Sequence, residues 1–212
     1  MRIVRSLIIS AGALAMAGTA SAQDIWHNVQ VKVGVSLIQP DESSSISVIG
    51  GEANISDEYV PTLQIEYFFS NNISAELLCC IAEHEVKAEN TALGTVDLGK
   101  VSHFPPTLTV KYHWTDMGAF QPYLGAGVNY TTFYDKQLPA GGPVTAIHYD
   151  DSFGGALQAG FDYKLDDHWS LNVDVRKVWI SSDVAISAGA TQIVAQVDVD
   201  PLIFTVGSGY RF

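Results

Sequence analysis

The sequence is dominated by short stretches in which apolar residues alternate with polar or small ones. At the carboxyl end, Leu202, Phe204 and Val206 occupy every second position, and Thr205 and Gly207 follow Phe204 and Val206. A period of two places successive side chains on opposite faces of a β-strand. Residues 202–212 therefore predict a strand with one apolar face and one polar or small face.

Other stretches share this alternation, and together with residues 202–212 they predict eight strands. Two irregular features precede the last strand. The phase slips at Lys177-Val178, which predicts a bulge, and residues 184–199 alternate about a small-residue turn, which predicts a projecting hairpin. The remaining predicted strands are residues 29–37, 63–69, 73–81, 107–114, 120–130, 153–163 and 169–176.

The connections between these strands alternate strictly between short and long. Short turns are expected at residues 70–72, 115–119 and 165–168, and long connections at residues 39–59, 83–103 and 134–150 and around the projecting hairpin. This order is typical of a barrel whose periplasmic turns are short and whose outer loops are long. The predicted fold class is all-β, an eight-stranded antiparallel up-and-down transmembrane β-barrel.

Alternation alone does not tell the inside of a barrel from the outside. A lipocalin-like soluble barrel also has eight strands, with its apolar residues inside. Aromatic residues that gather at both strand ends favour a membrane barrel, because they resemble interfacial girdles. The expected girdles contain Phe69, Trp114, Phe120, Tyr163, Trp169 and Phe212 at the short-turn end, and Tyr59, Tyr130, Phe133, Phe153 and Trp179 at the other.

The amino-terminal segment has the three parts of a secretory signal peptide. Arg2 and Arg5 precede an apolar stretch from Leu7 to Ala17, and Ala20-Ser21-Ala22 forms a cleavage site. A signal peptide is therefore predicted at residues 1–22 and a barrel domain at residues 23–212. The whole chain has 11 Lys and Arg against 23 Asp and Glu, a net charge of −12. Such an acidic chain is a poor candidate for binding nucleic acid, which requires clustered cations.

The carboxyl-terminal strand also carries a specific resemblance. Thr205, Gly207, Tyr210 and Phe212 match the terminal signal of outer-membrane β-barrel proteins, which has a polar residue, a Gly and two hydrophobic residues ending on an aromatic one. The resemblance implies that the barrel-assembly machinery reads these four residues. It also implies that the protein resides in the outer membrane of a Gram-negative bacterium.

If the apolar faces meet lipid, charged residues must turn inward, since Arg or Lys on the lipid side costs roughly 2–4 kcal/mol at mid-depth. Eight strands leave room for side chains only, so these charges are expected to form a paired network, the charged plug, in the periplasmic half. Its predicted members are Lys32, Glu66, Glu76, Lys111, Asp162, Asp174, Arg176 and Arg211.

The outer half of the interior is expected to be apolar. Inward positions nearer the long connections carry Ile38, Leu78, Cys80, Phe133 and Ile203. Two interpretations remain open on composition alone. These side chains form a pocket for a hydrophobic molecule above the charged plug, or they simply pack the interior.

Three stretches resemble the OmpW outer-membrane family, which includes AlkL-type alkane importers. They are Pro105–Leu108, Pro122–Phe133 and Gly209–Phe212. The resemblance implies a barrel with a hydrophobic lumen that takes small hydrophobic molecules across the lipopolysaccharide layer and releases them sideways through the wall. The expected partners are outer-membrane lipid and lipopolysaccharide, the assembly machinery and small hydrophobic solutes. Inward Arg176 departs from an apolar lining and leaves the range of solutes open.

Two other functions have some support in the sequence. Long loops rich in Asp, Glu, Ser and Gly suit a structural or receptor barrel that binds phage, toxins or host surfaces. A lipid-hydrolysing barrel would need a Ser and an acid beside a His, and no such partners are expected for the four candidate histidines. No catalytic residue, metal or cofactor is predicted: in Glu83-His84-Glu85 neighbouring side chains point apart, and Cys79 and Cys80 are read as small apolar fillers. The candidate histidines are His84, His103, His113 and His148.

Overall fold

The structure is a computed structural model that describes residues 26–47, 50–92, 94–139, 144–189 and 191–212. The predicted signal peptide, residues 1–22, lies outside the described residues. The described chain is built of strands, and it contains no helix long and apolar enough to cross a bilayer. The strands are β1 (Val29–Gln39), β2 (Ser43–Ile46), β3 (Glu52–Ile55), β4 (Glu58–Phe68), β5 (Ile73–Cys79), β6 (Ala82–Thr91), β7 (Gly94–Phe104), β8 (Thr107–His113), β9 (Phe120–Gln137), β10 (Ala146–Tyr149), β11 (Ser152–Lys164), β12 (Trp169–Val178), β13 (Ser181–Ala188), β14 (Thr191–Asp198) and β15 (Leu202–Arg211).

Eight of these strands form a closed antiparallel barrel, as predicted. Their order around the barrel is β1-β4-β5-β8-β9-β11-β12-β15, and the pairing of β15 with β1 completes the circle. Gly34 and Gly207 are cross-strand partners at this last seam. A Cβ atom on Gly34 would lie only 2.5 Å from the carbonyl oxygen of Val206, so the close approach of the two backbones requires glycine there.

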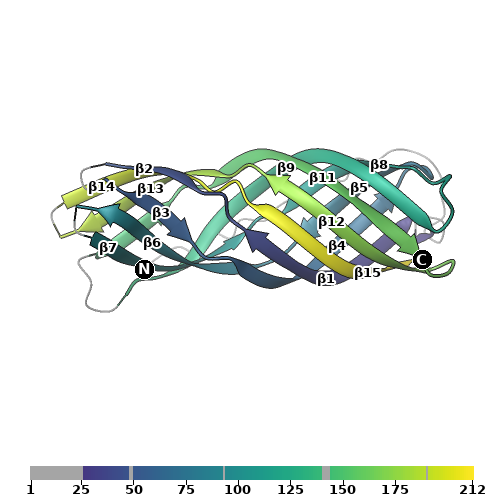
Figure 1. Ribbon diagram of the computed structural model, residues 1–212, viewed down its shortest axis with the longest axis horizontal. Helices are drawn as coiled ribbons and strands as arrows, with labels where there is room; N and C mark the ends of the chain where they lie inside the picture. The colour runs from purple at the N-terminus through teal and green to yellow at the C-terminus, as the bar shows by residue number, and fades with distance from the viewer. Residues whose placement is uncertain (1–25, 48–49, 93, 140–143, 190) are drawn as a thin grey trace, which may run out of the picture.

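The three segments predicted to be long connections are largely folded into strands. The segments at residues 39–59, 83–103 and 134–150 contain β2, β3, β6, β7, β10 and the ends of β4 and β9. With the β13–β14 hairpin, which was predicted, they form an extension beyond one end of the barrel (Figure 1). The extension has two facing sheets, one of β3, β6, β7 and the end of β9, the other of β10, β13, β14 and β2.

The two halves of the molecule bury opposite kinds of residue. In the barrel, apolar side chains such as Val33, Val110 and Val206 point outward and are 56–65% exposed, whereas Lys32, Glu66 and Lys111 are buried inside. In the extension the apolar side chains are the ones buried, between the two sheets. This reversal follows from the solvent: lipid surrounds the barrel wall, while water surrounds the extension.

The reversal corrects the bulge predicted at Lys177-Val178. The ladder of β12 with β11 runs through Lys177 and Val178 without a register shift. Arg176, Val178 and Ile180 all point inward in one unbroken alternation, and so do the buried residues of β13 that follow. The apparent slip is a change of chemistry, because inward positions change from polar to apolar where the strand leaves the lipid.

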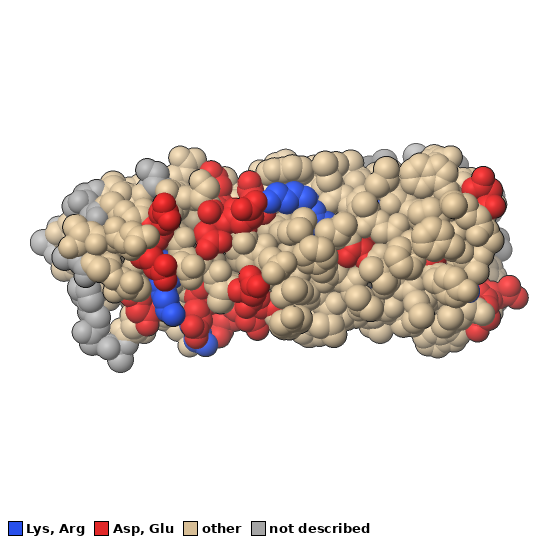
Figure 2. All heavy atoms as spheres, viewed as in Figure 1, with Lys and Arg blue, Asp and Glu red and all other residues tan. Residues whose placement is uncertain are grey.

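Figure 2 shows one face of the barrel as a nearly uncharged belt, with charged side chains gathered beyond it on the extension and at the opposite end. The exposed aromatic residues lie near the two ends of the barrel strands, where girdles were expected. Phe133 is the exception. Its ring is partly buried against Tyr149 inside the extension rather than facing lipid, so its place in the outer girdle was wrong.

Candidate functional site

The barrel interior holds a dense network of ion pairs around two glutamates. Lys32 Nζ lies 2.6 Å from Glu66 Oε2 and 3.1 Å from Glu76 Oε2. Lys111 Nζ lies 3.0 Å and 2.9 Å from the same two oxygens. All four side chains are at most 2% exposed. Each ammonium therefore sits between two carboxylates, which offsets the cost of burying these charges.

Further charged residues extend this network across the lumen. Arg176 Nη2 lies 2.8 Å from Glu76 Oε1 and 3.6 Å from Asp174 Oδ2. Lys32 Nζ lies 3.5 Å from Asp162 Oδ2. The structure thus brings together seven of the eight residues assigned to the charged plug. We use that name below for Lys32, Glu66, Glu76, Lys111, Asp162, Asp174 and Arg176.

Arg211 lies apart from the charged plug. Its guanidinium carbon is 4.0 Å from the centroid of the Phe68 ring, and the residue is only partly buried at the short-turn end of the barrel. This arrangement is a cation–π contact rather than an ion pair. The alternation of the sequence correctly predicted that Arg211 turns inward, but it could not predict how far along the barrel axis Arg211 lies from the charged plug.

One histidine does have a serine and an acid beside it, contrary to expectation. His113 Nε2 lies 3.0 Å from Ser74 Oγ and 2.9 Å from Glu66 Oε1, and the Ser74 hydroxyl donates to Glu66. A catalytic relay uses the two different ring nitrogens of the histidine, one toward the serine and one toward the acid. Here one nitrogen faces both partners, and all three residues are sealed in the lumen. The cluster therefore extends the buried polar network and has no relay geometry.

An apolar layer covers the charged plug on the side of the extension. Of the residues predicted to line an apolar lumen, Ile38, Cys80 and Ile203 belong to this layer, and Phe133 packs against it. Leu78 is buried between Glu76 and Cys80 in the alternation, so it lies between the plug and the layer. The layer consists of Ile38, Val60, Cys80, Ala82, Ala156, Val178, Ile180 and Ile203.

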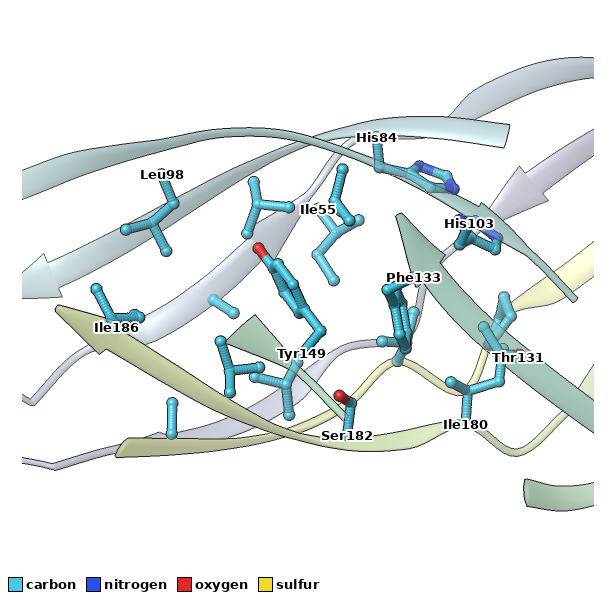
Figure 3. A pocket seen from close by; sticks show the side chains of 18 of the residues that line it. Ile55, His84, Leu98, His103, Thr131, Phe133, Tyr149, Ile180, Ser182 and Ile186 are labelled. Carbon is cyan, nitrogen blue, oxygen red and sulfur yellow. The ribbon is translucent and has the colours of Figure 1, made fainter. Parts of the chain in front are cut away.

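Beyond the layer, the two sheets of the extension enclose a cavity of about 60 Å³ with an almost wholly apolar wall (Figure 3). Ile38 and Phe133 line it. Its other walls come partly from the predicted hairpin of β13 and β14 and partly from β2, β3, β6 and β7, strands in segments predicted to be long connections. The alternation that predicts a strand is present in residues 82–88, where Ala82, Val86 and Ala88 alternate with charged residues. Further lining residues include Ile55, Leu98, Val101, Ile180, Val184, Ile186, Ala195 and Val197.

Four rings form a row along the cavity: His84, His103, Phe133 and Tyr149. The two imidazoles are stacked with centroids 5.0 Å apart, and Phe133 is stacked on Tyr149 at 5.5 Å. His103 and Phe133 join the pairs at 6.1 Å (Figure 3). Burial lowers the pKa of His103 to about 3, and the neighbouring His84 adds to the effect. Burial lowers the pKa of His84 as well, although its Nδ1 contacts the Ser56 carbonyl oxygen at 2.7 Å.

These lowered pKa values predict an extension that weakens in acid. Below about pH 6.5 the unfolded chain binds a proton at His103 that the folded chain rejects until about pH 3. Stability is therefore lost as the pH falls through this range, by roughly 2 kcal/mol at pH 5 for this one group. Unfolding by urea in lipid vesicles at pH 8 and pH 5 measures the loss. His103→Phe should reduce it, whereas His148→Phe, at a 71% exposed side chain, should leave it unchanged; equal pH dependence in all three proteins would contradict the assignment.

The other residues considered for metal or redox chemistry lie apart from one another. His84 points inward, while Glu83 and Glu85 point outward toward Lys100, as expected for neighbours on a strand. Among the described residues no group of three or more His, Cys, Asp or Glu side chains is arranged to hold a metal ion. Cys79 and Cys80 are free thiols, and Cys80 packs in the apolar layer.

Known proteins share this architecture. Residues 27–212 match the sequence profile of the OmpW family. The chain belongs to the OmpW family. This OmpW-family chain is 39% identical to the uncharacterized outer-membrane protein y4mB of Sinorhizobium fredii, over 92% of its own length and 83% of that protein. It is 32% identical to outer membrane protein W of Vibrio cholerae, over 95% and 97% of the two chains. The crystal structure of OprG from Pseudomonas aeruginosa superposes with a TM-score of 0.79 at 32% identity, covering 87% of this chain and 95% of that one.

Membership of the OmpW family places this chain in the outer membrane of Gram-negative bacteria as a multi-pass β-barrel. Proteins of this family and fold are outer-membrane barrels rather than known enzymes. The uncharged belt and the inward charges agree with that location.

Proposed function

We propose that the protein is a passive conduit that carries small hydrophobic molecules across the outer membrane. The proposal rests on the order in which apolar and charged regions follow one another along the barrel axis. An apolar cavity lies in the extension, an apolar layer follows, and a closed network of buried charges lies below. Transfer of a hydrophobic molecule from water into the cavity lowers its free energy. Passage through the buried ions would raise the free energy steeply, because the charges would lose their polar partners.

We further propose that the molecule leaves sideways through the wall between β4 and β5. The β4 strand begins at Glu58, but its ladder with β5 starts only at Leu63, opposite Cys79. In this interval Val60 and Cys80 both belong to the apolar layer. An apolar path thus reaches the wall where the backbone ladder is interrupted, and Pro61 has no N–H to bridge it.

Filling the cavity tests the proposed function. Ala195 is 3% exposed and lines the cavity, so Ala195→Trp should fill it and reduce uptake of a long alkane by about tenfold or more, since a bulky side chain cannot be accommodated without displacing the ligand. Uptake is compared between cells that lack the protein and cells that produce the wild type or the variant. A folded, outer-membrane-inserted variant that takes up alkane at the wild-type rate would contradict the proposal.

The matched control is Ala185→Trp. Ala185 pairs with Val194 on the outer face of the same hairpin, next to the inward Val184. The new ring then projects into water, and uptake should equal that of the wild type. Heat-modifiable gel migration and the amount of protein in the outer membrane report folding of both variants.

We also propose that the last strand serves as an assembly signal and that lipopolysaccharide surrounds the finished barrel. Thr205 is buried against Ser36 at 2.7 Å, and Tyr210 contacts the rings of Trp169 and Phe212. Thr205, Gly207 and Tyr210 lie on β15, where it pairs with β1 to close the barrel. Recognition of this strand by the assembly machinery would precede the pairing that buries it. Phe212→Ala should therefore lower the rate of insertion more than the stability of the inserted barrel, which pulse-labelling and urea unfolding distinguish.

A further inference from the structure

Arg176 occupies a special position between the charged plug and the apolar layer. On β12 the inward residues run from Asp174 to Arg176 and then to Val178. Across the ladders, Arg176 is paired with Gln158 of β11 and with Ile203 of β15, and Ile203 belongs to the apolar layer. Arg176 is thus the member of the plug that abuts the layer. A molecule that descends from the cavity reaches its guanidinium before any other buried charge on this strand.

The guanidinium group is only partly satisfied. Its Nη2 atom donates to Glu76 Oε1 at 2.8 Å. Its Nε and Nη1 atoms are buried and have no acceptor among the described residues, and the whole residue is 1% exposed. Every N–H of a guanidinium is a donor and none can accept. The N–H groups on Nε and Nη1 of Arg176 therefore require acceptors, and no acceptor of the described residues lies within hydrogen-bond distance of them.

The surrounding charges decide which kind of oxygen fits. Three cations of the plug, Lys32, Lys111 and Arg176, face four carboxylates. The four are Glu66, Glu76, Asp162 and Asp174. An additional anion beside Glu76 and Asp174 would be repelled, because buried like charges interact strongly. A neutral carbonyl or hydroxyl oxygen can accept a hydrogen bond from an unpartnered N–H group of Arg176 without that repulsion.

We propose that Arg176 binds the head group of the transported molecule, and that the preferred solutes are hydrophobic chains with a neutral oxygen acceptor, such as ketones, esters or alcohols. This inference rests on the proposed function and narrows it to a class of solute. The chain extends from the cavity through the apolar layer, and the oxygen accepts a hydrogen bond from one of the two unpartnered nitrogens, Nε or Nη1. Arg176 then acts as a specificity-determining residue at the floor of the conduit.

Equilibrium binding of labelled ligands tests the proposal. The purified protein is placed in nanodiscs of ether-linked phospholipid, so that lipid ester oxygens cannot occupy the site, and binding to empty nanodiscs is subtracted. The ligands are 2-dodecanone, dodecane and dodecanoate, which share a twelve-carbon chain. The ketone is expected to bind about tenfold or more tightly than the other two, as for one buried hydrogen-bonded group.

Variants assign the preference to Arg176. Arg176→Leu should lower the affinity for the ketone to that for dodecane, so that the ratio of the two affinities falls to about one. Lys177→Leu is the matched control, since Lys177 is the outward neighbour on β12 and binds Asp41 and the Asp200 carbonyl oxygen. If Arg176→Leu does not fold, Arg176→Lys keeps a cation near Glu76 but loses the planar donor edge, and it should also lose most of the ketone preference.

The outcomes separate this inference from the proposed function. Equal wild-type affinity for all three ligands, or a ketone preference that survives in a folded Arg176→Leu protein, overturns the role of Arg176 and leaves a conduit for hydrophobic molecules intact. Tighter binding of dodecanoate overturns the neutral-oxygen class. Binding of no ligand above the level of empty nanodiscs overturns the proposed function itself.

Discussion

Replacing Glu76 with Gln is expected to destabilise the barrel by about 3–5 kcal/mol, as measured when one partner of a buried ion pair is removed. Glu76 contacts Lys32, Lys111 and Arg176 within 3.1 Å, and its side chain is fully buried. The substitution keeps the size of the side chain and removes its charge. Lys111 then keeps only Glu66 as an ion-pair partner, Lys32 keeps Glu66 and Asp162, and the guanidinium loses its nearest carboxylate. Urea unfolding in lipid vesicles gives the change in free energy.

Glu85→Gln is the control for this prediction. Glu85 is 3.4 Å from Lys100, and both side chains are about half exposed in water. Exposed ion pairs contribute at most about 1 kcal/mol, so the control should unfold at nearly the wild-type urea concentration. If Glu76→Gln and Glu85→Gln unfold alike, the charged plug does not stabilise the barrel in the way its geometry implies.

Replacing Val206 with Arg is expected to cost roughly 2–4 kcal/mol, the range for a cation at the middle of the lipid face. Val206 is 65% exposed and pairs with Val35 and Val173, which also point outward from the uncharged belt. Val194→Arg makes the same chemical change at a 54% exposed position on β14 of the extension. Water surrounds that site, so the change in free energy should stay within about 0.5 kcal/mol. Similar losses for both variants in vesicles would mean that the belt does not face hydrocarbon.

The barrel strands could be predicted because lipid contacts their outer face along the whole barrel, so most outward positions are apolar. In β8, Leu108, Val110 and Tyr112 are all exposed and the residues between them are all buried, so a single alternation fixes both face and strand. The strict order of short and long connections then fixed the topology. No register information was needed for either step.

The extension and the depth of individual side chains could not be predicted in the same way. In β6 the small residues Ala82 and Ala88 alternate with acidic ones, and small residues among acids resemble a solvated loop. The contact of Ser74, His113 and Glu66 joins β5, β8 and β4, and it depends on cross-strand register. Alternation identifies inward residues on each strand, but only the ladders show which of them share a level.

The length of β9 has a consequence for the cell surface. Its 18 residues extend about 60 Å at roughly 3.3 Å per residue. Tilted by about 40°, such a strand rises some 45 Å, well beyond an apolar wall about 25 Å tall. The extension therefore projects beyond the hydrocarbon surface. Under the proposal that lipopolysaccharide surrounds the barrel, the cavity lies at the level of its sugars. An oily molecule would then cross the hydrated carbohydrate zone inside protein, which is the zone that otherwise excludes it.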